Sequence, residues 1–552
     1  MKKIAFVFFT VAAVMVLTAC DRQSSFDEND VRLSLRSVWY GGYQAPEDQY
    51  NNPVAAAIRE KTGVTVTIDG IMMDALEYIN LMFASGDMPD IINTALWGGA
   101  DGMTQVLKKA AAQGLLHPIQ DMLEKYPNVK RSYDIGVISQ SYLEQDLMDP
   151  AFDGNLYFIP NQTAGNADNL INWTPGIFVR GDVPQALGID PASIKTQEDL
   201  YNFMVMARDY GFKDVNGNDV IVATTFQTGW DYNQYLTNFT DEKLTDFIRT
   251  EDGAITHRFL TQNYIDSNMF IWRLINEDLF DRECFRQTVT QAYTKMGNGT
   301  ALFFGALYHA GIDATQQTGL YTAHPEMRYV PVGPLNYADG SPLTQIETVG
   351  RTGCPVLFFP KTNKHLDASF RYIDFINTIE GMTLAQYGIE GMTWEQNDQG
   401  QPRLIKDFLD RQAAGDISWQ DEMRDVGAGY IANLMTYGSL FMEWFGEASP
   451  GAEEIAIPEH EAYKKMRPIK QIPGYPLRGS ADFPEWDRVS SLFDGEMERV
   501  YRERAYFART EAEARSILLD FQNYLRTQHN GVFMDWLEFM TQKANSRPDT
   551  AL

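Results

Sequence analysis

Residues 31–38 read VRLSLRSV, in which apolar and polar side chains alternate as they do in a β-strand with one buried face. A helical stretch follows at 52–61 and closes at Gly63, and residues 64–68 (VTVTI) form a second strand. A second helix is expected over 75–84, with Gly86 as its C-cap, before a short strand at 89–93 (PDIIN). This order of strand, helix, strand, helix and strand predicts an α/β fold on a parallel sheet with helices on its faces.

The same alternation continues along the chain. Thr196 and Asp199 have the spacing of a capping box and open an amphipathic helix over 196–210. Further strands are expected at 176–180, 220–225 and 301–304, and further helices at 282–296, 366–378 and 511–527. A chain of 552 residues is too long for one small core, which predicts at least two lobes. Because no low-complexity linker separates them, we expect the chain to cross between the lobes more than once.

The N-terminus has the layout of a secretory signal. Lys2 and Lys3 precede a largely apolar run from Ile4 to Leu17, which is too short to span a bilayer comfortably. Leu17-Thr18-Ala19-Cys20 then resembles the bacterial lipobox, so we expect residues 1–19 to be removed and Cys20 to be acylated. Residues 20–29 would form a tether at the outer face of the cytoplasmic membrane. The alternative is a plain signal peptide with an incidental cysteine.

Charge and cysteine content exclude some partners. The formal charge is −28, and it becomes −30 when the two signal-peptide lysines are removed. An exported body this acidic repels phosphate backbones, so nucleic acid is not an expected partner. Cys284 and Cys354 could pair, but they are far apart in the sequence, and we expect both to be buried small hydrophobes. Asp21 after Cys20 would favour inner-membrane retention in some cells that have an outer membrane.

Five segments, in order, resemble the extracellular solute-binding lipoproteins of bacterial ABC importers, of the large oligosaccharide-binding type with a maltose-binding-protein-like fold. They are ASGDMPDI at 84–91, DGNLYFIP at 153–160, IFVRGD at 177–182 followed by Leu187-Gly188, GNGTAL at 297–302 and YGIEGMTW at 387–394. Together they cover most of residues 30–400. The sequence departs from the pattern at Gly181, where the family usually has lysine.

The resemblance implies a two-lobed periplasmic-binding-protein-like fold with hinge strands and a ligand cleft. Lobe 1 would take residues 30–158 and about 352–440, and lobe 2 would take 159–351. Residues of about 441–552 would form C-terminal helices that pack across both lobes. The implied function is capture of an oligosaccharide or glycan fragment by lobe closure, for delivery to the permease subunits of an ABC importer. We expect a monomer.

Ligands of open α/β sheets bind beyond the carboxyl ends of strands, and aromatic rings cover the apolar faces of sugars. The candidates at such places are Trp39, Tyr40, Trp97, Trp230 and Tyr308, together with Trp173 just before a strand and Trp394 after the Gly391 turn. Asp231, Arg180 and Arg351 are the candidate hydrogen-bonding partners. For any single tryptophan, core packing is about as good an explanation, and each charged residue has a structural alternative; the prediction is for the group.

Neither a metal nor a catalytic centre is predicted. Asp214-Val215-Asn216-Gly217-Asn218 has the alternating oxygen ligands of a calcium loop, but Val222 and Ala223 stand where the closing acidic pair would fall, so a tight turn is preferred. The seven histidines are scattered, and neither a P-loop nor a Gly-X-Ser-X-Gly elbow is present. We therefore expect a binding protein without a cofactor. The alternatives are a binder of peptides or other small solutes, a binding protein associated with a sensor, and an exported glycan-degrading enzyme.

Overall fold

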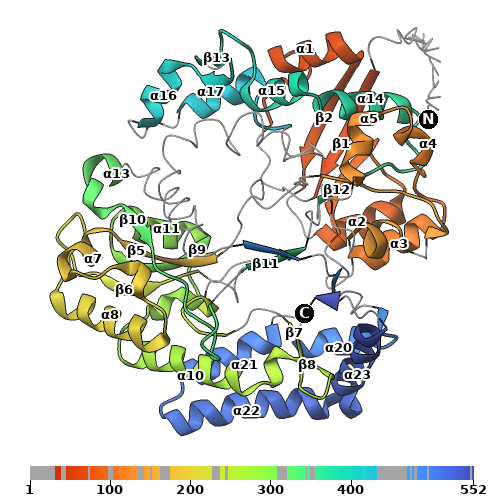
Figure 1. Ribbon diagram of the computed structural model, residues 1–552. Helices are drawn as coiled ribbons and strands as arrows, with labels where there is room; N and C mark the ends of the chain where they lie inside the picture. Colours follow the sequence, from red (N-terminus) through yellow and green to blue (C-terminus); the bar gives the residue numbers. More distant parts are fainter. Residues whose placement is uncertain are drawn as a thin grey trace, which may run out of the picture.

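The computed structural model describes most of the chain from Val31 onward, and it shows two α/β bodies and a group of C-terminal helices (Figure 1). The described residues are 31–38, 45–71, 75–96, 103–134, 138, 142–149, 152–161, 175–226, 236–242, 246–307, 320–342, 345–348, 355–398, 400–413, 416, 418–431, 469–472, 475–477, 482–493, 496–546 and 550–551.

The first lobe is built on a five-stranded sheet in the order β2-β1-β3-β12-β4. Its strands are β1 (Val31–Ser37), β2 (Val64–Gly70), β3 (Ile91–Ala95), β12 (Pro355–Phe358) and β4 (Ile159–Pro160). β1 pairs in parallel with β2 and β3, which confirms the predicted parallel core of the sheet. β12 and β4 extend it in antiparallel pairings that the local pattern does not predict.

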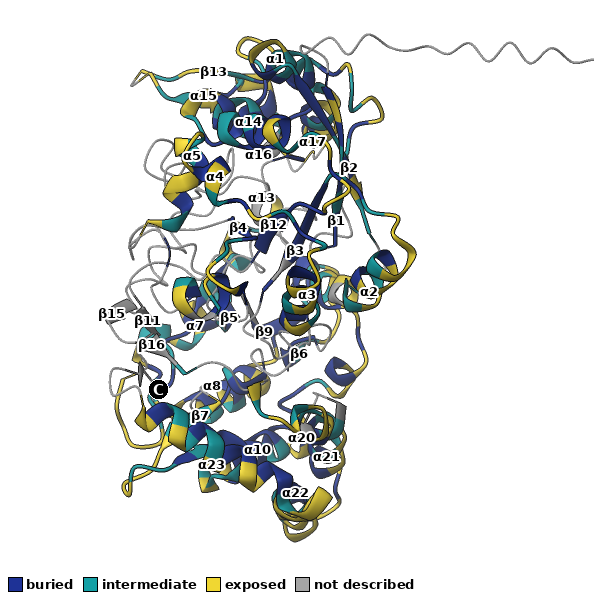
Figure 2. Cartoon of the chain, turned by 90° about the vertical axis from the view of Figure 1, so that its right-hand side faces the viewer, coloured by how far each residue is buried: buried dark blue, intermediate teal, exposed yellow. Residues whose placement is uncertain are grey.

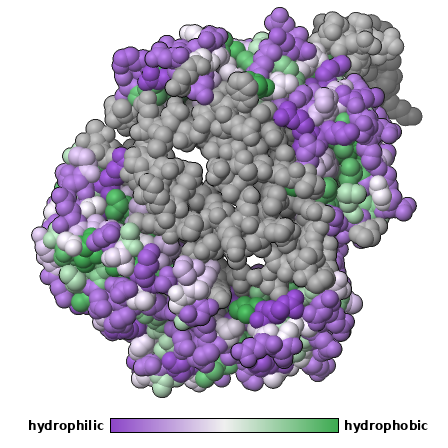
Figure 3. Space-filling view, viewed as in Figure 1, coloured by the Kyte–Doolittle hydropathy of each residue, from purple (hydrophilic) through white to green (hydrophobic). Residues whose placement is uncertain are grey.

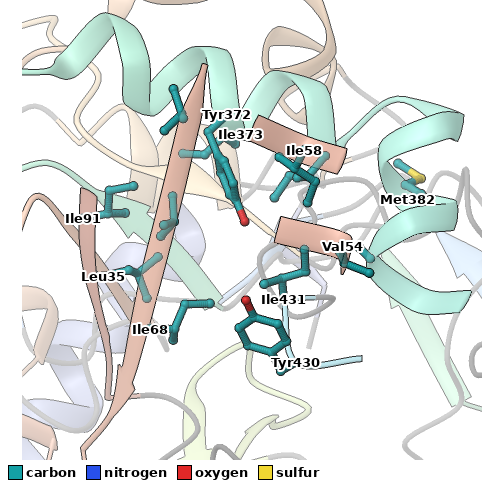
Figure 4. Packing of buried hydrophobic residues seen from close by; sticks show 14 of the residues in the cluster. Leu35, Val54, Ile58, Ile68, Ile91, Tyr372, Ile373, Met382, Tyr430 and Ile431 are labelled. Carbon is teal, nitrogen blue, oxygen red and sulfur yellow. The ribbon is translucent and has the colours of Figure 1, made fainter. Parts of the chain in front are cut away.

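Helices cover both faces of this sheet. Val31, Leu33 and Leu35 point to one face, where they pack with residues of α1 (Pro53–Thr62), α14 (Leu366–Ile376) and α15 (Ile379–Tyr387) (Figure 4). α2 (Ala75–Ser85) and α3 (Met103–Ala112) cover the other face. Asn52 caps α1 by accepting a hydrogen bond from Ala55 N at 2.8 Å, as N-cap residues do.

The second lobe has a four-stranded sheet in the order β10-β5-β9-β6. Its strands are β10 (Tyr329–Pro331), β5 (Pro175–Arg180), β9 (Ala301–Leu307) and β6 (Ile221–Thr224). β6 and β9 are parallel, whereas β5 is antiparallel to both of its neighbours. α8 (Gln197–Tyr210), with the predicted capping box at Thr196, and α10 (Gln262–Asn276) cover one face. α11 (Val289–Gly297) covers the other.

The helix predicted over 282–296 is two elements. Arg282–Phe285 forms the 3-10 turn η6, and α11 begins only at Val289. The break has a local cause, because Thr288 caps α11 with Gln291 in a capping box, while the Gln287 side chain donates a hydrogen bond to the Thr225 carbonyl. Helical periodicity continues through such a break, so the pattern does not reveal it.

The C-terminal helices pack on the second lobe. α20 (Trp486–Phe493), α21 (Glu496–Tyr506), α22 (Glu511–Thr527) and α23 (Val532–Asn545) share a core with α10 and the hairpin of β7 (Phe247–Arg249) and β8 (Ile255–His257). The sequence predicts contacts with both lobes. Toward the first lobe, Lys108 of α3 lies 4.0 Å from the carboxylate of Asp482, just before α20.

In the order of the described elements, the chain changes from one lobe to the other three times. β4 belongs to the first sheet and β5 to the second, so the first crossing begins after residue 160. The sequence analysis assigned residues 159–160 to lobe 2, whereas in the structure they pair with β12 in lobe 1. The chain returns between β11 (Gln345–Thr348) and β12. It leaves again after residue 431 and reaches β15 (Ile469–Ile472), which pairs in parallel with β11.

The remaining elements are short. They are α4 (Gln120–Leu123), α5 (Pro127–Lys130), α7 (Asp182–Leu187), α13 (Leu320–Ala323), α16 (Lys406–Ala413), α17 (Ser418–Val426), β13 (Trp394–Gln396), β14 (Pro402–Leu404), β16 (Tyr475–Pro476), β17 (Thr550–Ala551), η1 (Arg131–Tyr133), η2 (Leu143–Leu147), η4 (Pro191–Ser193), η5 (Arg258–Leu260), η7 (Pro325–Met327) and η11 (Gln528–Gly531). Figure 2 shows buried strands inside both lobes and exposed residues on the outer sides of the helices.

Candidate functional site

The carboxyl ends of β1, β2 and β3 in the first lobe, and those of β6 and β9 in the second, point toward the centre of the molecule (Figure 1). β1, β2 and β3 end at Ser37, Gly70 and Ala95 in the first lobe. From the second lobe, β6 and β9 end at Thr224 and Leu307, and Pro175, the first residue of β5, pairs with Leu307 at the same edge. Since ligands bind beyond the carboxyl ends of strands, this central zone is the candidate site.

Most residues predicted for the site follow these strand ends along the chain. Trp39 and Tyr40 come after β1, Trp97 after β3, Trp230 and Asp231 after β6, and Tyr308 directly after β9, while Trp173 precedes β5. These seven positions, together with Cys20, Arg351 and Cys354, lie outside the described residues. The structure brings the neighbouring strand ends together in one zone. The contacts of these seven residues with a ligand stay predictions.

A buried hydrogen-bond pair holds the strand ends of the first lobe together. Ser37 Oγ donates to Asn93 Oδ1 at 3.0 Å, and Val38 N donates to the Asn93 carbonyl at 2.9 Å. Asn93 Nδ2 in turn donates to the carbonyl of Val356 at 3.4 Å. The segments that leave β1 and β3 therefore start from a platform of fixed geometry.

A second polar cluster holds the end of β6. Thr224 donates its hydroxyl to Asp281 Oδ2 at 2.8 Å and accepts a hydrogen bond from Gln287 Nε2 at 2.8 Å. Lys295 Nζ lies 2.6 Å from Asp281 Oδ2. Burial acts to lower the pKa of Lys295, but its hydrogen bonds to Asp281 and Glu283 leave that pKa raised, so the lysine is a cation that balances the cluster. The sequence analysis missed these residues because their roles depend on contacts far along the chain.

Arg180 is buried inside the second lobe. Its Nε and Nη2 atoms lie 2.8 and 2.9 Å from the two carboxylate oxygens of Asp182, and Nη1 donates to the carbonyls of Lys213 and Gly299. A bidentate arginine–carboxylate pair orients both groups, so this placement favours the structural alternative for Arg180. The neighbouring departure from the family pattern also has a cause, because a Cβ atom on Gly181 would lie 2.5 Å from the Arg328 carbonyl oxygen.

Trp394 lies in β13 at the outer end of the first lobe (Figure 1). Its indole N–H donates to the Gly388 carbonyl at 3.2 Å, and its ring packs against the first-lobe core. Gly388 itself has φ +84° and ψ −131°, a conformation open only to glycine. The YGIEGMTW segment is therefore a hydrogen-bonded turn, and the placement of Trp394 favours core packing, the alternative that the sequence left open.

The loop at Asp214 is a tight turn. The amides of Asn216 and Asn218 donate to Asp214 Oδ1, both at 2.8 Å, and Asn218 Nδ2 donates to Oδ2 at 3.1 Å. These bonds hold the pKa of Asp214 below its usual value, although desolvation is the largest single effect and opposes them. The carboxylate accepts hydrogen bonds from its own loop, as in an Asx turn, which agrees with the preferred prediction.

Three further features of the described residues concern metals, thiols and membrane segments. Among these residues, His, Cys, Asp and Glu side chains form no group of three that could hold a metal ion. Cys284 is a buried free thiol, as predicted. Among the same residues no helix has the length and apolar character needed to cross a membrane.

One open cavity adjoins the central edge of the first lobe. Its volume is about 540 Å³, and it is lined by Ala45, Pro46, Gln49, Ile68, Asp69, Gly70 and Arg424. Asp69 directly follows the strand predicted at 64–68, but the sequence analysis names no candidate at this strand end.

No protein-family model and no curated protein matches the chain. Solved structures match it over nearly its whole length. The alginate-binding protein AlgQ2 without calcium ion shares 18% identity, with 93% of this chain and 98% of that chain covered and a TM-score of 0.63. The S. pneumoniae ABC-transporter substrate binding protein FusA in complex with kestose shares 16% identity, over 94% and 100% of the two chains, with a TM-score of 0.61. The N-glycan transport solute binding protein NgtS from Streptococcus pneumoniae shares 11%, over 94% and 99%, with a TM-score of 0.58. These likenesses confirm the two-lobed fold.

Proposed function

We propose that this chain, which has the two-lobed fold of ABC-transporter solute-binding proteins, is a lipid-anchored substrate-binding protein that captures an oligosaccharide or glycan fragment. The observation that carries the proposal is the convergence of strand ends from both lobes, four of which (β1, β3, β6 and β9) are followed in the sequence by aromatic residues. The solved structures of similar fold are described as alginate-binding, kestose-bound and N-glycan transport proteins, which supports a glycan as the ligand.

The residue types suit a sugar. Aromatic rings such as those of Trp97 and Trp230 cover the apolar C–H face of a pyranose. Hydroxyl groups need donors and acceptors, and a buried one left unpaired costs about 1–3 kcal/mol, so side chains such as Asp231 and Arg351 would set the specificity. Peptide binding remains the second candidate, because the same fold and aromatic residues could serve another solute.

Capture would use the hinge. A ligand shifts the equilibrium between open and closed forms only through contacts that it gains on closure, so residues from both lobes must touch it. β11 and β15 lie side by side where two of the passes between the lobes occur, which suits hinge strands. The loaded protein would then dock on permease subunits. On the face seen in Figure 3, most described side chains are hydrophilic.

Thermal-shift screening of the mature protein tests the ligand class. The panel would hold monosaccharides, linear oligosaccharides, peptides and amino acids, and stabilisation by oligosaccharides alone is expected. Stabilisation by peptides alone would contradict the proposal. Chromatography of the stabilising sugar after incubation tests the enzymatic alternative, because a binding protein returns the sugar intact.

Trp97→Ala and Trp230→Ala are each expected to weaken binding of the stabilising oligosaccharide about tenfold or more, because a stacked ring contributes roughly 1–3 kcal/mol. Their melting temperatures should stay close to that of the parent. Trp394→Ala is the matched control, and it should lower the melting temperature without changing the affinity, since its indole is bound to Gly388. Calorimetric titration measures the affinities, and parental values for both site variants would remove these residues from the site.

The anchor is tested by mass spectrometry of protein from a bacterial membrane fraction. We expect the first peptide of the mature chain to start at Cys20 and to carry acyl chains, because stable anchoring needs more than one chain. Cys20→Ser should lose that added mass. A free thiol on Cys20, or a mature terminus elsewhere, would mean a plain signal peptide.

A further inference from the structure

An open cavity lies at the end of β2, beside the central zone, and none of the candidate aromatic residues is among its described lining residues. Ile68, Asp69 and Gly70 supply one wall at the carboxyl end of the strand, and Ala45, Pro46 and Gln49 supply a second before α1. Arg424, near the end of α17, closes the third side. All of these residues belong to the first lobe, so the cavity does not depend on lobe closure. The cavity has a volume of about 540 Å³ and is open to solvent.

The wall of the cavity is firmly built. Ile68 N donates to Gln49 Oε1 at 2.7 Å, and Gln49 Nε2 donates to the Ile68 carbonyl at 3.1 Å. The Gln49 amide therefore pairs with the edge strand as a neighbouring backbone would, and it satisfies groups that an edge leaves open. Because both ends of the amide are engaged, Gln49 contributes shape to the cavity and not a free hydrogen-bonding group.

The charged groups of the cavity balance each other. Asp69 is exposed, and among the described residues its carboxylate has no hydrogen bond or ion pair. Arg424 is oriented by Asp421, with Nη2 2.7 Å from the carboxylate. Asp69 disfavours an anion and Arg424 disfavours a cation. A hydroxylated ring without charge can donate to the carboxylate and accept from the guanidinium.

We infer that this cavity binds one uncharged sugar unit, at the end of a glycan whose other units occupy the central zone. The inference rests on the proposed function and refines it: the substrate is a neutral oligosaccharide long enough to extend from the aromatic residues to the end of β2. The register supports this reach, because Gly70 of β2 pairs with Ser37, the last residue of β1, and places both strand ends on one edge.

The test is the dependence of affinity on chain length. Calorimetric titrations would use malto-, manno- and inulin-type fructo-oligosaccharides of increasing length, and alginate oligomers as a charged probe. For the longest bound member of a neutral series, Asp69→Ala is expected to weaken binding about 10- to 100-fold, as loss of a hydrogen bond to a charged group does. The shortest bound member should keep its parental affinity.

Arg424→Gln should reproduce this pattern, which guards against a local defect of one variant. Glu60→Gln is the matched control, because Glu60 is an exposed carboxylate of the same lobe that does not line the cavity. Equal loss at every length, unchanged affinity at every length, or a preference for alginate oligomers would each overturn the inference while the proposed function stands. A parent protein that binds no saccharide at all would overturn both.

Discussion

Arg258→Met is expected to lower the free energy of unfolding by about 3–5 kcal/mol, the usual cost of leaving a buried charge without its partner. Arg258 Nη1 donates to Glu242 Oε1 at 2.9 Å, and the two side chains are 8% and 2% exposed. Removing the guanidinium leaves the Glu242 carboxylate in a site where water cannot solvate it.

The pair belongs to a polar network that joins the second lobe to the C-terminal helices. Glu498 and Arg502 of α21 form a second buried pair with their charged atoms 3.0 Å apart, and Tyr264 of α10 donates its hydroxyl to Glu498 at 2.9 Å. Because both pairs are buried at the same interface, loss of Arg258 should also loosen the docking of α21. Scanning calorimetry should then show a lower melting temperature for Arg258→Met than for the parent protein.

Two variants separate the charge effect from lost packing. Glu242→Met with Arg258→Met removes both charges, and it should recover much of the stability, as replacement of buried pairs by apolar residues often does. Arg488→Met breaks an exposed pair with Glu485, whose side chains are 63% and 48% exposed, so it should cost less than about 1 kcal/mol. A double variant as unstable as Arg258→Met alone would contradict the explanation.

The deficit of Arg258→Met should also depend on pH. Burial raises the pKa of Glu242, and the charge of Arg258 opposes that rise. Without Arg258 the pKa rises further, so the folded protein takes up a proton that the unfolded chain, with a pKa of about 4.3, releases. Stability relative to the parent therefore increases as the pH falls, and the deficit is largest at neutral pH and smaller near pH 5. Urea unfolding at both values measures this difference.

Gly427→Ala is the second substitution with a large expected effect, a loss of roughly 2–4 kcal/mol from backbone strain and a displaced helix cap. Gly427 has φ +97°, and a Cβ atom there would lie 2.0 Å from Asn52 Oδ1. That oxygen accepts the hydrogen bond that caps α1, so the added methyl group must displace the cap or the chain after α17.

Gly429→Ala supplies the matched control. Gly429 also has a positive φ, +86°, but a Cβ atom there meets nothing within 4 Å, so only the backbone term of about 1 kcal/mol applies. Asn52→Gly in the Gly427→Ala background should relieve the contact and restore part of the stability. Equal losses at both glycines, measured by urea unfolding, would show that the contact with Asn52 costs nothing.

The local elements were largely predictable. The helix expected over 511–527 is α22 at the same bounds, and Thr196 caps α8 with Asp199 as predicted. The structure confirms the three parallel strands of the first sheet. They were predictable because alternating side chains and glycine stops depend only on neighbours in the chain. The prediction of a single helix over 282–296 was wrong because its break depends on Gln287, which donates a hydrogen bond to the Thr225 carbonyl just after β6.

The sequence predicted where the candidate site lies better than it predicted which side chains contact one another. The rule that ligands lie beyond strand ends placed the aromatic candidates at the edges that meet in the centre. It could not separate Trp394 and Arg180 from them, since those side chains bind Gly388 and Asp182 within their own lobes. Nor could it find the cavity of Asp69 and Arg424, which are brought together only after the chain has passed through the second lobe.

The order of residues along the chain thus decided the α/β elements, their caps and the parallel start of the first sheet, because these depend on interactions over a few residues. The passage of the chain between the lobes decided the antiparallel β12 and β4 and the docking of α21 on α10. Such contacts join segments far apart in the sequence, and their energies depend on burial, which no short pattern of residues encodes.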